Sequence, residues 1–231
     1  MTDPTIAPRK PTWGWWEPGT VALMRRVVRP GWTVFDFGAH VGYYSTLLSE
    51  LVGSEGAVHA FEPHPGNRDV LRGNLRGSTN VTVVPRAVSD RIERRPFHFS
   101  SNTGRHSLFE SSFMQQDGMV VEVECTTIDA YWASIGRPTV ELLKIDVEGA
   151  EVLAMSGAVE MLNRCPDITI VSEFYPENLR NAGSGPAEYL ALLAGLGLSI
   201  QTILDDGSLR PGVPELSGDD YVNVCLRRSH P

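Results

Sequence analysis

Short β-branched runs alternate with helical patterns from residue 32 onward, and this alternation limits the possible folds more than any other feature of the sequence. Strand-like runs occur at residues 32–37, 56–62, 80–85, 140–146, 167–174 and 198–204. Helical patterns follow most of them, at residues 42–53, 67–77, 148–163 and 185–197. This rhythm predicts an α/β fold with a doubly wound, mostly parallel sheet. No helical pattern separates the last two strands, which predicts an antiparallel return at one edge of the sheet.

Two regions depart from this alternation within a chain whose length of 231 residues suits one domain. Residues 1–30 are rich in proline and tryptophan, so we expect them to cap a domain that spans residues 31–231. Residues 91–125 hold short alternating runs around a polar loop, which predicts a mixed β/loop insertion. This insertion could be a lid, a simple addition to the fold or the contact of a homodimer, and the sequence leaves these alternatives open.

Charge and composition argue against several kinds of partner. A formal net charge of −8 argues against a nucleic-acid surface, and the small basic groups at residues 25–29 and 91–95 are expected to be solvated. No apolar run approaches the ~18–20 residues that span a bilayer, and no secretory signal is evident, so we expect a cytoplasmic protein without a membrane partner. The spacing of Cys125, Cys165 and Cys225 is typical of reduced packing residues.

The stretch FDFGAHVGYYSTL, at residues 35–47, joins the first predicted strand to a helix and raises the question of a cofactor. Its Asp-Phe-Gly is not the kinase magnesium motif, because no glycine-rich loop, strand lysine or HRD loop precedes it. Gly38 and Gly42 could instead form a turn that holds a cofactor. The motif GAHVG departs from GxGxxG, since His40 stands two residues after Gly38, so the glycines alone are a weak signal for a dinucleotide.

Two carboxylates indicate which cofactor such a turn would hold. Glu62 ends the second predicted strand, where a carboxylate can accept hydrogen bonds from both hydroxyls of a ribose. Asp36 ends the first strand and puts negative charge where a pyrophosphate would approach. That charge suits the ammonium and sulfonium groups of S-adenosylmethionine (SAM), whose carboxylate could use backbone N–H groups of the turn. The sequence therefore predicts SAM rather than a nicotinamide dinucleotide.

Several motifs together resemble the FkbM-type SAM-dependent methyltransferases: VFDFGAHVGYYS, AFEPHPGNRDVLRGNL, AVSD, TTIDAY and LLKIDVEGAEVLAMSGA. The resemblance runs over residues 31–173, and KIDVEGAE at residues 144–151 is its most specific element. It implies a class I methyltransferase fold, with a Rossmann-like sheet of seven strands, the last antiparallel, and helices on both faces. It also implies O-methylation, typically of a sugar or natural-product hydroxyl. His40 departs from the family, which often has Asn there, and this puts one contact to the cofactor in doubt.

The family's cofactor residues carry over onto matching positions of this chain. The resemblance places the methionine end of SAM against Asp36 and the glycine turn, and the ribose against Glu62. It places the adenine against residues 87–90, with Asp90 as a partner for the exocyclic amine. The cofactor-binding residues implied in this way are Asp36, Gly38, Ala39, His40, Gly42, Glu62, Pro63, Ala87, Ser89 and Asp90.

A hydroxyl acceptor must lose a proton during methyl transfer, so a general base is expected. Asp146 and Glu173 end adjacent predicted strands, at the level where ligands of open α/β sheets bind, and either could be that base. Lys144 lies two residues before Asp146 on the same strand face and could pair with an acid or hold an anionic group. His106, in the polar loop of the insertion, and His64, near the predicted ribose site, are competing candidates.

Other polar and aromatic residues near these candidates have structural interpretations. Glu148 and Glu151 open the helix after the predicted strand and are expected to complement its dipole or to cap it. Trp13, Trp15 and Trp16 are expected to pack against an N-terminal helix, with a wall of the acceptor pocket as the alternative.

The sequence thus predicts a SAM-dependent O-methyltransferase that acts on a hydroxyl of a sugar or secondary-metabolite small molecule. A divalent metal shared by Asp146 and Glu173 is an alternative that we do not favour, because no third ligand is evident. N- or carboxyl methylation on the same scaffold, a NAD-dependent oxidoreductase and a non-catalytic SAM-binding module are the competing hypotheses.

Overall fold

The structure is a computed structural model and describes residues 16–99, 106–109 and 120–228. Its centre is an eight-stranded sheet, in which β3, β2, β1, β8 and β9 run parallel. Across the sheet the order is β3 (Val81–Val84), β2 (Ala57–Phe61), β1 (Thr33–Phe37), β8 (Leu142–Ile145), β9 (Thr169–Phe174), β12 (Val222–Arg228), β10 (Leu198–Ile203) and β11 (Leu209–Pro211). The predicted α/β class and mostly parallel, doubly wound sheet are confirmed.

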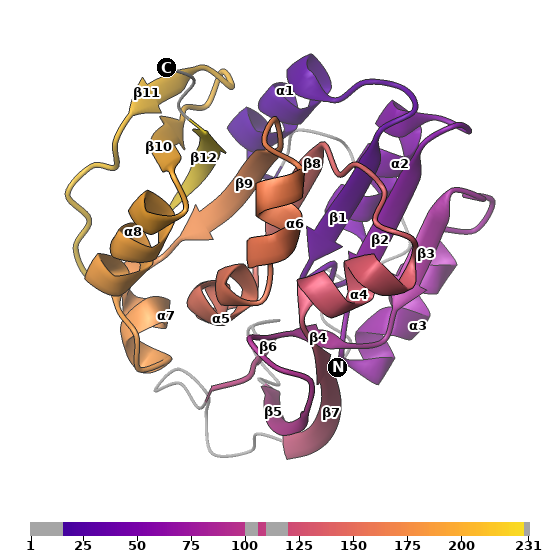
Figure 1. The fold of residues 1–231 in the computed structure, drawn as a ribbon, viewed down its shortest axis with the longest axis horizontal. Coiled ribbons are helices and arrows are strands. Elements are labelled where there is room, and N and C mark those ends of the chain that lie inside the picture. The colour runs from indigo at the N-terminus through magenta and orange to yellow at the C-terminus, as the bar shows by residue number, and fades with distance from the viewer. Residues whose placement is uncertain (1–15, 100–105, 110–119, 229–231) are drawn as a thin grey trace.

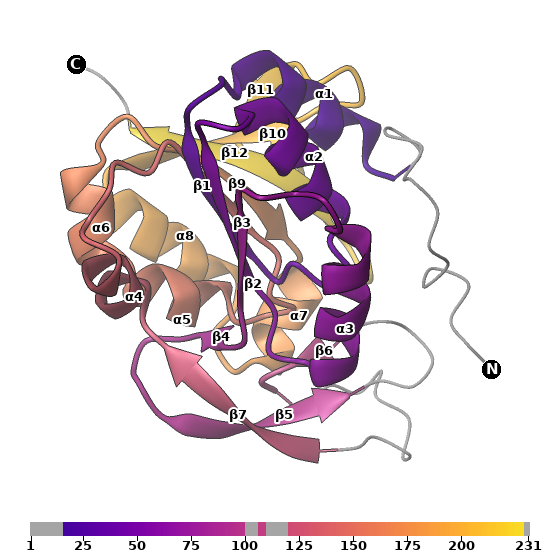
Figure 2. The ribbon, with the colours of Figure 1, turned by 90° about the vertical axis from the view of Figure 1, so that its right-hand side faces the viewer.

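Helices cover both faces of the sheet (Figures 1 and 2). One face carries α1 (Pro18–Val27), α2 (Tyr43–Val52) and α3 (Pro65–Asn74). The other carries α4 (Ile128–Ser134), α5 (Glu151–Ser156), α6 (Val159–Arg164) and α8 (Pro186–Gly195), with α7 (Pro176–Asn181) following β9. Alternate strand residues serve the two faces: Val34 packs with Leu23 and Leu48 of α1 and α2, whereas Phe35 packs with Met155 of α5.

The insertion, together with the short β4 that precedes it, forms a second, four-stranded sheet beyond the carboxyl ends of the parallel strands (Figure 1). Its order is β4 (Ala87–Val88), β7 (Val120–Thr126), β5 (Arg94–Phe99) and β6 (His106–Ser107). The hydroxyl of Ser107 donates a hydrogen bond of 2.7 Å to the carbonyl of Glu148, in the loop after β8. The insertion therefore contacts the sheet edge at which a ligand is expected.

The final strand corrects one prediction. β12 lies between β9 and β10 and is antiparallel to both, and the short β11 adds an eighth strand at the edge. The antiparallel strand is present, but its predicted place at the edge was wrong. Val224, Cys225 and Leu226 are fully buried, and such a run needs cover on both faces and neighbours on both sides. Because β12 is antiparallel, its first residues lie at the same edge as the carboxyl ends of β8 and β9.

The single helix predicted over residues 148–163 is in fact the two short helices α5 and α6. The backbone of Gly157, between them, approaches Ser89 so closely that a Cβ would lie 2.2 Å from the carbonyl oxygen of Ser89. The carboxylate of Asp129 accepts hydrogen bonds from the N–H groups of Glu160 and Met161, at 2.9 and 2.8 Å, and thereby caps α6. Both contacts that divide the helix join segments far apart in the sequence, so the local hydrophobic periodicity could not predict the break.

The state of the cysteines and the lengths of the helices bear on two expectations from composition. The three cysteines are free and buried, as expected for packing residues. Among the described residues, no helix combines the length and the apolar character that crossing a bilayer requires.

Candidate functional site

The glycine turn between β1 and α2 bends through three left-handed residues, Gly38, His40 and Gly42, whose φ angles are 77°, 50° and 91°. Histidine is one of the few residues other than glycine that is enriched in this conformation, which explains how the turn accommodates His40. A Cβ on Gly38 would lie 1.8 Å from the carbonyl oxygen of Asp146. The turn therefore needs glycine there to pass between β1 and β8.

Glu62, directly after β2, is 4% exposed and holds the glycine turn against the turn that follows β2. Its carboxylate accepts hydrogen bonds from the N–H groups of His40 and His64, at 2.9 and 2.7 Å, and from the Asn67 amide at 3.5 Å. Burial raises the pKa of Glu62 to about 7, although these hydrogen bonds oppose the rise. Oε2 accepts one of the three bonds, so it keeps a lone pair for a ligand hydroxyl.

A buried polar cluster lies under α2, on the face of the sheet that Asp36 and Lys144 share as neighbours in register. The Lys144 side chain is fully buried, and Nζ lies 3.2 Å from Oδ2 of Asp146 and 5.0 Å from the centre of the Tyr44 ring. Burial lowers the pKa of Lys144, but Asp146 and other nearby carboxylates outweigh burial and raise it. The hydroxyl of Ser45 donates to Oδ2 of Asp36 at 2.6 Å.

The buried position of Asp36 gives a pH-dependent prediction. Burial raises its pKa from 3.8 to about 6, although Ser45 and Lys144 oppose the rise. The stability from its protonated form is complete below pH 4 and is lost as the pH rises through 6. Asp36→Asn removes this loss. The free energy of unfolding of the variant, relative to that of wild type, should therefore be about 2 kcal/mol higher at pH 7.5 than at pH 4.5.

Urea unfolding at the two pH values measures this difference. The control is Asp69→Asn, which changes an exposed acid that pairs with Arg72. A gain that is equal at both pH values would show that Asp36 does not titrate in this range.

Asp146 directly follows β8, Glu173 is the last residue but one of β9, and the residues just before these acids, Ile145 and Ser172, are register partners. The two acids are therefore neighbours at the carboxyl edge of the sheet, as predicted. Burial raises the pKa of Glu173 well above its ordinary value, and Asp146 and Glu148 raise it further by like-charge repulsion. Lys144 donates to Asp146 and only partly offsets this repulsion at Glu173.

The loop after Asp146 holds two further acids with structural partners. Glu151, the first residue of α5, accepts hydrogen bonds from the N–H groups of Val147 and Gly149, both at 3.3 Å, and so ties the loop before the helix to its first turn. Burial raises its pKa to about 7. Glu148 is left-handed, with a φ of 51°, and accepts a hydrogen bond of 2.7 Å from the Asn178 amide in α7. The loop is thereby fixed between the insertion and α7.

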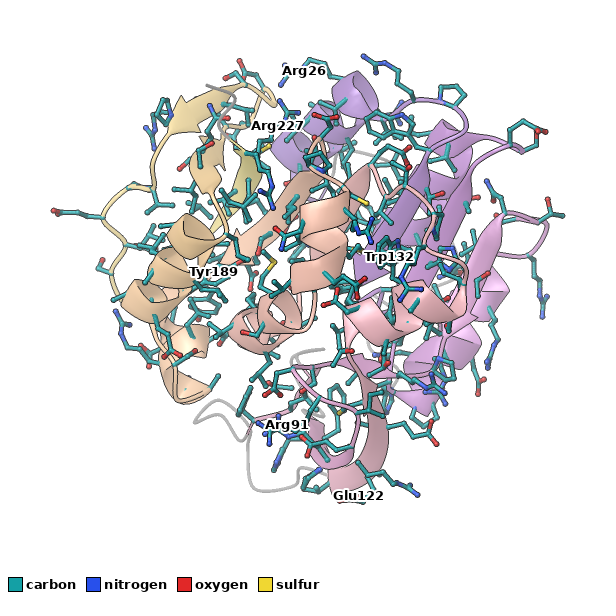
Figure 3. All side chains as sticks on the ribbon, viewed as in Figure 1. Arg26, Arg91, Glu122, Trp132, Tyr189 and Arg227 are labelled. Atoms are coloured by element: carbon teal, nitrogen blue, oxygen red, sulfur yellow. The ribbon has the colours of Figure 1, made fainter. Side chains whose placement is uncertain are left out.

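The residues predicted to contact adenine lie at the junction of β4 and β7. Ser89 is fully buried, and its N–H donates a hydrogen bond to the carbonyl of Thr126. Its hydroxyl donates to the carboxylate of Asp90 at 3.1 Å. Arg91 donates to the other carboxylate oxygen at 2.8 Å and holds the pKa of Asp90 below its usual range. Figure 3 shows Arg91 on the insertion, far from Arg26 at the other end of the molecule. Ala87 is buried in β4, and an adenine role for this segment stays a prediction.

The remaining candidates take different positions. His106 begins β6 in place of the expected loop, and its side chain lies outside the described part. His64 is the N-cap of α3, and its ring Nδ1 accepts the N–H of Asn67 at 3.0 Å, which is a structural role. Trp13 and Trp15 lie outside the described residues. Trp16 is 51% exposed, and its carbonyl accepts a hydrogen bond from Tyr43 at 3.0 Å.

Three residues that the sequence did not indicate as site residues lie at the polar cluster. The hydroxyl of Tyr44 donates to the carboxylate of Glu17, which brings the start of α1 to Lys144. Asn223, near the start of β12, is the register partner of Glu173. Tyr44 could have been noticed as the second residue after the glycine turn. Glu17 and Asn223 come from the two ends of the chain, and only the tertiary structure brings them here.

The described residues form no metal site, and a cavity among them lies away from the predicted site residues. Within residues 16–99, 106–109 and 120–228, no group of three or more His, Cys, Asp or Glu residues is arranged to hold a metal ion. A cavity of about 510 Å³ opens beside β7 and α4, and its lining includes Arg86, Glu124 and Tyr131 but none of the predicted site residues.

The methyltransferase FkbM domain matches residues 36–197 of this chain. The 31-O-demethyl-FK506 methyltransferase FkbM of Streptomyces tacrolimicus is 26% identical over 230 residues, which cover 87% of this chain and 83% of that protein. The 2-O-methyltransferase NoeI of Sinorhizobium fredii is 25% identical over 174 residues, which cover 68% of each protein.

Solved structures show the same fold. The methyltransferase FkbM of Methylobacillus flagellatus aligns with a TM-score of 0.52 and 15% identity over 90% of this chain, which spans 50% of that chain. The precorrin-6y C5,15-methyltransferase of Geobacter metallireducens aligns with a TM-score of 0.54 and 13% identity, over 96% of this chain and 94% of its own. The family domain extends over more than half of the sequence, and this protein belongs to the FkbM family of methyltransferases, as its motifs predicted.

Proposed function

We propose that this protein is a SAM-dependent O-methyltransferase whose acceptor is a hydroxyl of a sugar or another small molecule. The observation that carries the proposal is the environment of Glu173. Its carboxylate stands at the carboxyl edge of the sheet, beside the loop that Gly38 touches, and burial and neighbouring acids raise its pKa. A carboxylate with a raised pKa is a stronger base than an exposed one and is suited to accept the proton of a hydroxyl.

The residues around the glycine turn fit SAM. The N-cap of α2 is Gly42, which has no side chain to cap the helix, so the N–H groups of its first turn are suited to a carboxylate such as that of the methionine end. Glu62 keeps a lone pair for a ribose hydroxyl, and the charge of Asp36 lies below the turn. When bound, SAM supplies an electrophilic methyl group on a positively charged sulfur, and the nearby acids complement that charge.

The two neighbouring acids have different roles in this proposal. Asp146 accepts a hydrogen bond of 3.2 Å from Lys144, so one of its carboxylate oxygens already has a charged partner. Glu173 has the raised pKa and accepts the proton of the acceptor hydroxyl, while the hydroxyl oxygen forms its bond to the methyl carbon. Lys144 and Asp146 position the strand ends and limit the negative charge beside the base.

The named activities of relatives favour oxygen as the acceptor atom. Of the two relatives that align over most of the chain, one is named a 2-O-methyltransferase and the other a methyltransferase of 31-O-demethyl-FK506. Carboxyl methylation is the second candidate, because a protein-L-isoaspartate O-methyltransferase of Aeropyrum pernix is 39% identical over 83 residues, 35% of this chain and 32% of its own.

Transfer of a deuterated methyl group tests the proposal. The purified protein is incubated with CD3-labelled SAM and a mixture of methyl glycosides, polyketide alcohols and a small-molecule cell extract, and labelled products are fragmented by mass spectrometry. A base-stable O–CD3 ether supports the proposal. A base-labile methyl ester or an N–CD3 product would replace it with the corresponding alternative. The absence of any labelled product, with S-adenosylhomocysteine (SAH) still bound, would indicate a non-catalytic SAM-binding module.

A further inference from the structure

A second hydrogen-bond acceptor faces Glu173 across the sheet. Asn223 lies near the start of β12, directly opposite Glu173 in the antiparallel pair. Side chains of residues that pair directly lie on the same face, with Cβ atoms about 4.5–5.5 Å apart. Two residues along each strand, Cys225 and Val171 form the next pair and pack in the core with α1 and α2, which fixes the shared face.

Asn223 has a buried oxygen without a partner. Its Oδ1 has no exposed surface and accepts no hydrogen bond within the described part of the chain, although the residue as a whole is only half-buried. Lys144, on the same face, donates to Asp146. A buried acceptor without a donor is costly to a folded protein, and such groups are rare in interiors. Because the residue as a whole is half-buried, rotation of its amide group can turn Oδ1 toward the exposed side, where a ligand donor completes it.

We propose that Glu173 and Asn223 bind the acceptor together through two neighbouring donor groups, which makes the acceptor a vicinal diol or an amino alcohol. This inference rests on the proposed function. Glu173 receives the hydroxyl that becomes methylated, and Oδ1 of Asn223 accepts from a hydroxyl or amine on the adjacent carbon. A sugar ring carries such pairs on successive carbons. The carboxylates of Asp146 and Glu148 beside Glu173 repel phosphorylated or carboxylated acceptors.

Asn223→Leu tests the inference, because Leu has nearly the shape of Asn and no polar atom. The labelled-methyl assay with methyl glycosides and the cell extract should show about a 10-fold lower kcat/KM, from the loss of one hydrogen bond to the acceptor. The Kd for SAH should not change, because Asn223 is remote from the glycine turn. The Tm should rise by about 2–4 °C, because the variant no longer buries an unpaired oxygen.

Asn163→Leu is the matched control, since it removes an exposed amide that bonds to Arg228 at the other end of β12 and should leave transfer unchanged. Fragmentation of wild-type products gives a second readout, because the carbon next to the O–CD3 group should carry a hydroxyl or an amine. Products that are isolated alcohol ethers, or an Asn223→Leu variant with wild-type kcat/KM, would overturn the inference. If wild type binds SAH but labels nothing, the proposed function itself fails, and the inference fails with it.

Discussion

Glu173→Gln is expected to lower kcat for methyl transfer by about 10²–10⁴-fold, because glutamine keeps the shape of the side chain but cannot accept the hydroxyl proton. The Kd for SAH should stay at the wild-type value, since Glu173 lies in β9 and the glycine turn follows β1. In the wild type, kcat should rise with pH as Glu173, whose pKa is raised, loses its proton. The variant should lack this rise.

Initial rates with CD3-labelled SAM between pH 5 and pH 9 measure both effects. Glu188→Gln, an exposed change on α8, is the matched control and should keep the wild-type rate and pH profile. A Glu173→Gln variant with an unchanged rate would exclude Glu173 as the base. A slow variant that keeps the rising pH profile would assign the titration to another group.

Lys144→Met is expected to lower the free energy of unfolding by about 3 kcal/mol near pH 8. Methionine nearly matches lysine in length but leaves Asp146 and Asp36 without the cation that lies beside them. The side chain of Asp146 is 31% exposed, so water replaces part of the lost interaction and keeps the cost below that of a fully buried pair. Urea unfolding of the variant and the wild type measures the loss.

The effect of Lys144→Met should be smaller at pH 5.5, where Asp36 is protonated in the folded protein. Adding Asp36→Asn to Lys144→Met should restore part of the stability at pH 8, because it removes one of the two unpaired charges. Equal stability of Lys144→Met and wild type at both pH values would contradict the buried charge cluster.

The sequence predicts the parts of the fold that depend on local pattern. The strands before and after the glycine turn and the helices α2, α3 and α8 follow from periodicity and from the residues that end them. The place of β12 inside the sheet and the break at Gly157 depend on what lies across the interface. Val224 and Leu226 favour a strand whether it lies at the edge or inside the sheet. Nothing near Gly157 in the sequence shows that Ser89 packs against it.

The candidate site divides in the same way. Gly38, Glu62, Asp146 and Glu173 are predictable because strand ends in a parallel sheet meet at one edge. The pairing of Lys144 with Asp146 also follows from the period of a strand.

Glu17 and Asn223 are not predictable in this way. Each reaches the site through the packing of a terminal element, α1 or β12, whose position no local pattern contains.

The most direct test of a SAM-dependent enzyme at this edge is calorimetric titration of the protein with SAM, SAH and NAD. We expect saturable binding of SAM and SAH, weakened in Glu62→Gln and unchanged in the exposed control Glu55→Ala, with no binding of NAD. Glu62→Gln should keep its fold, shown by an unchanged cooperative thermal transition. If the protein binds NAD but not SAH, the cofactor assignment is contradicted. If Glu62→Gln binds SAH as tightly as wild type does, the position of the site is contradicted.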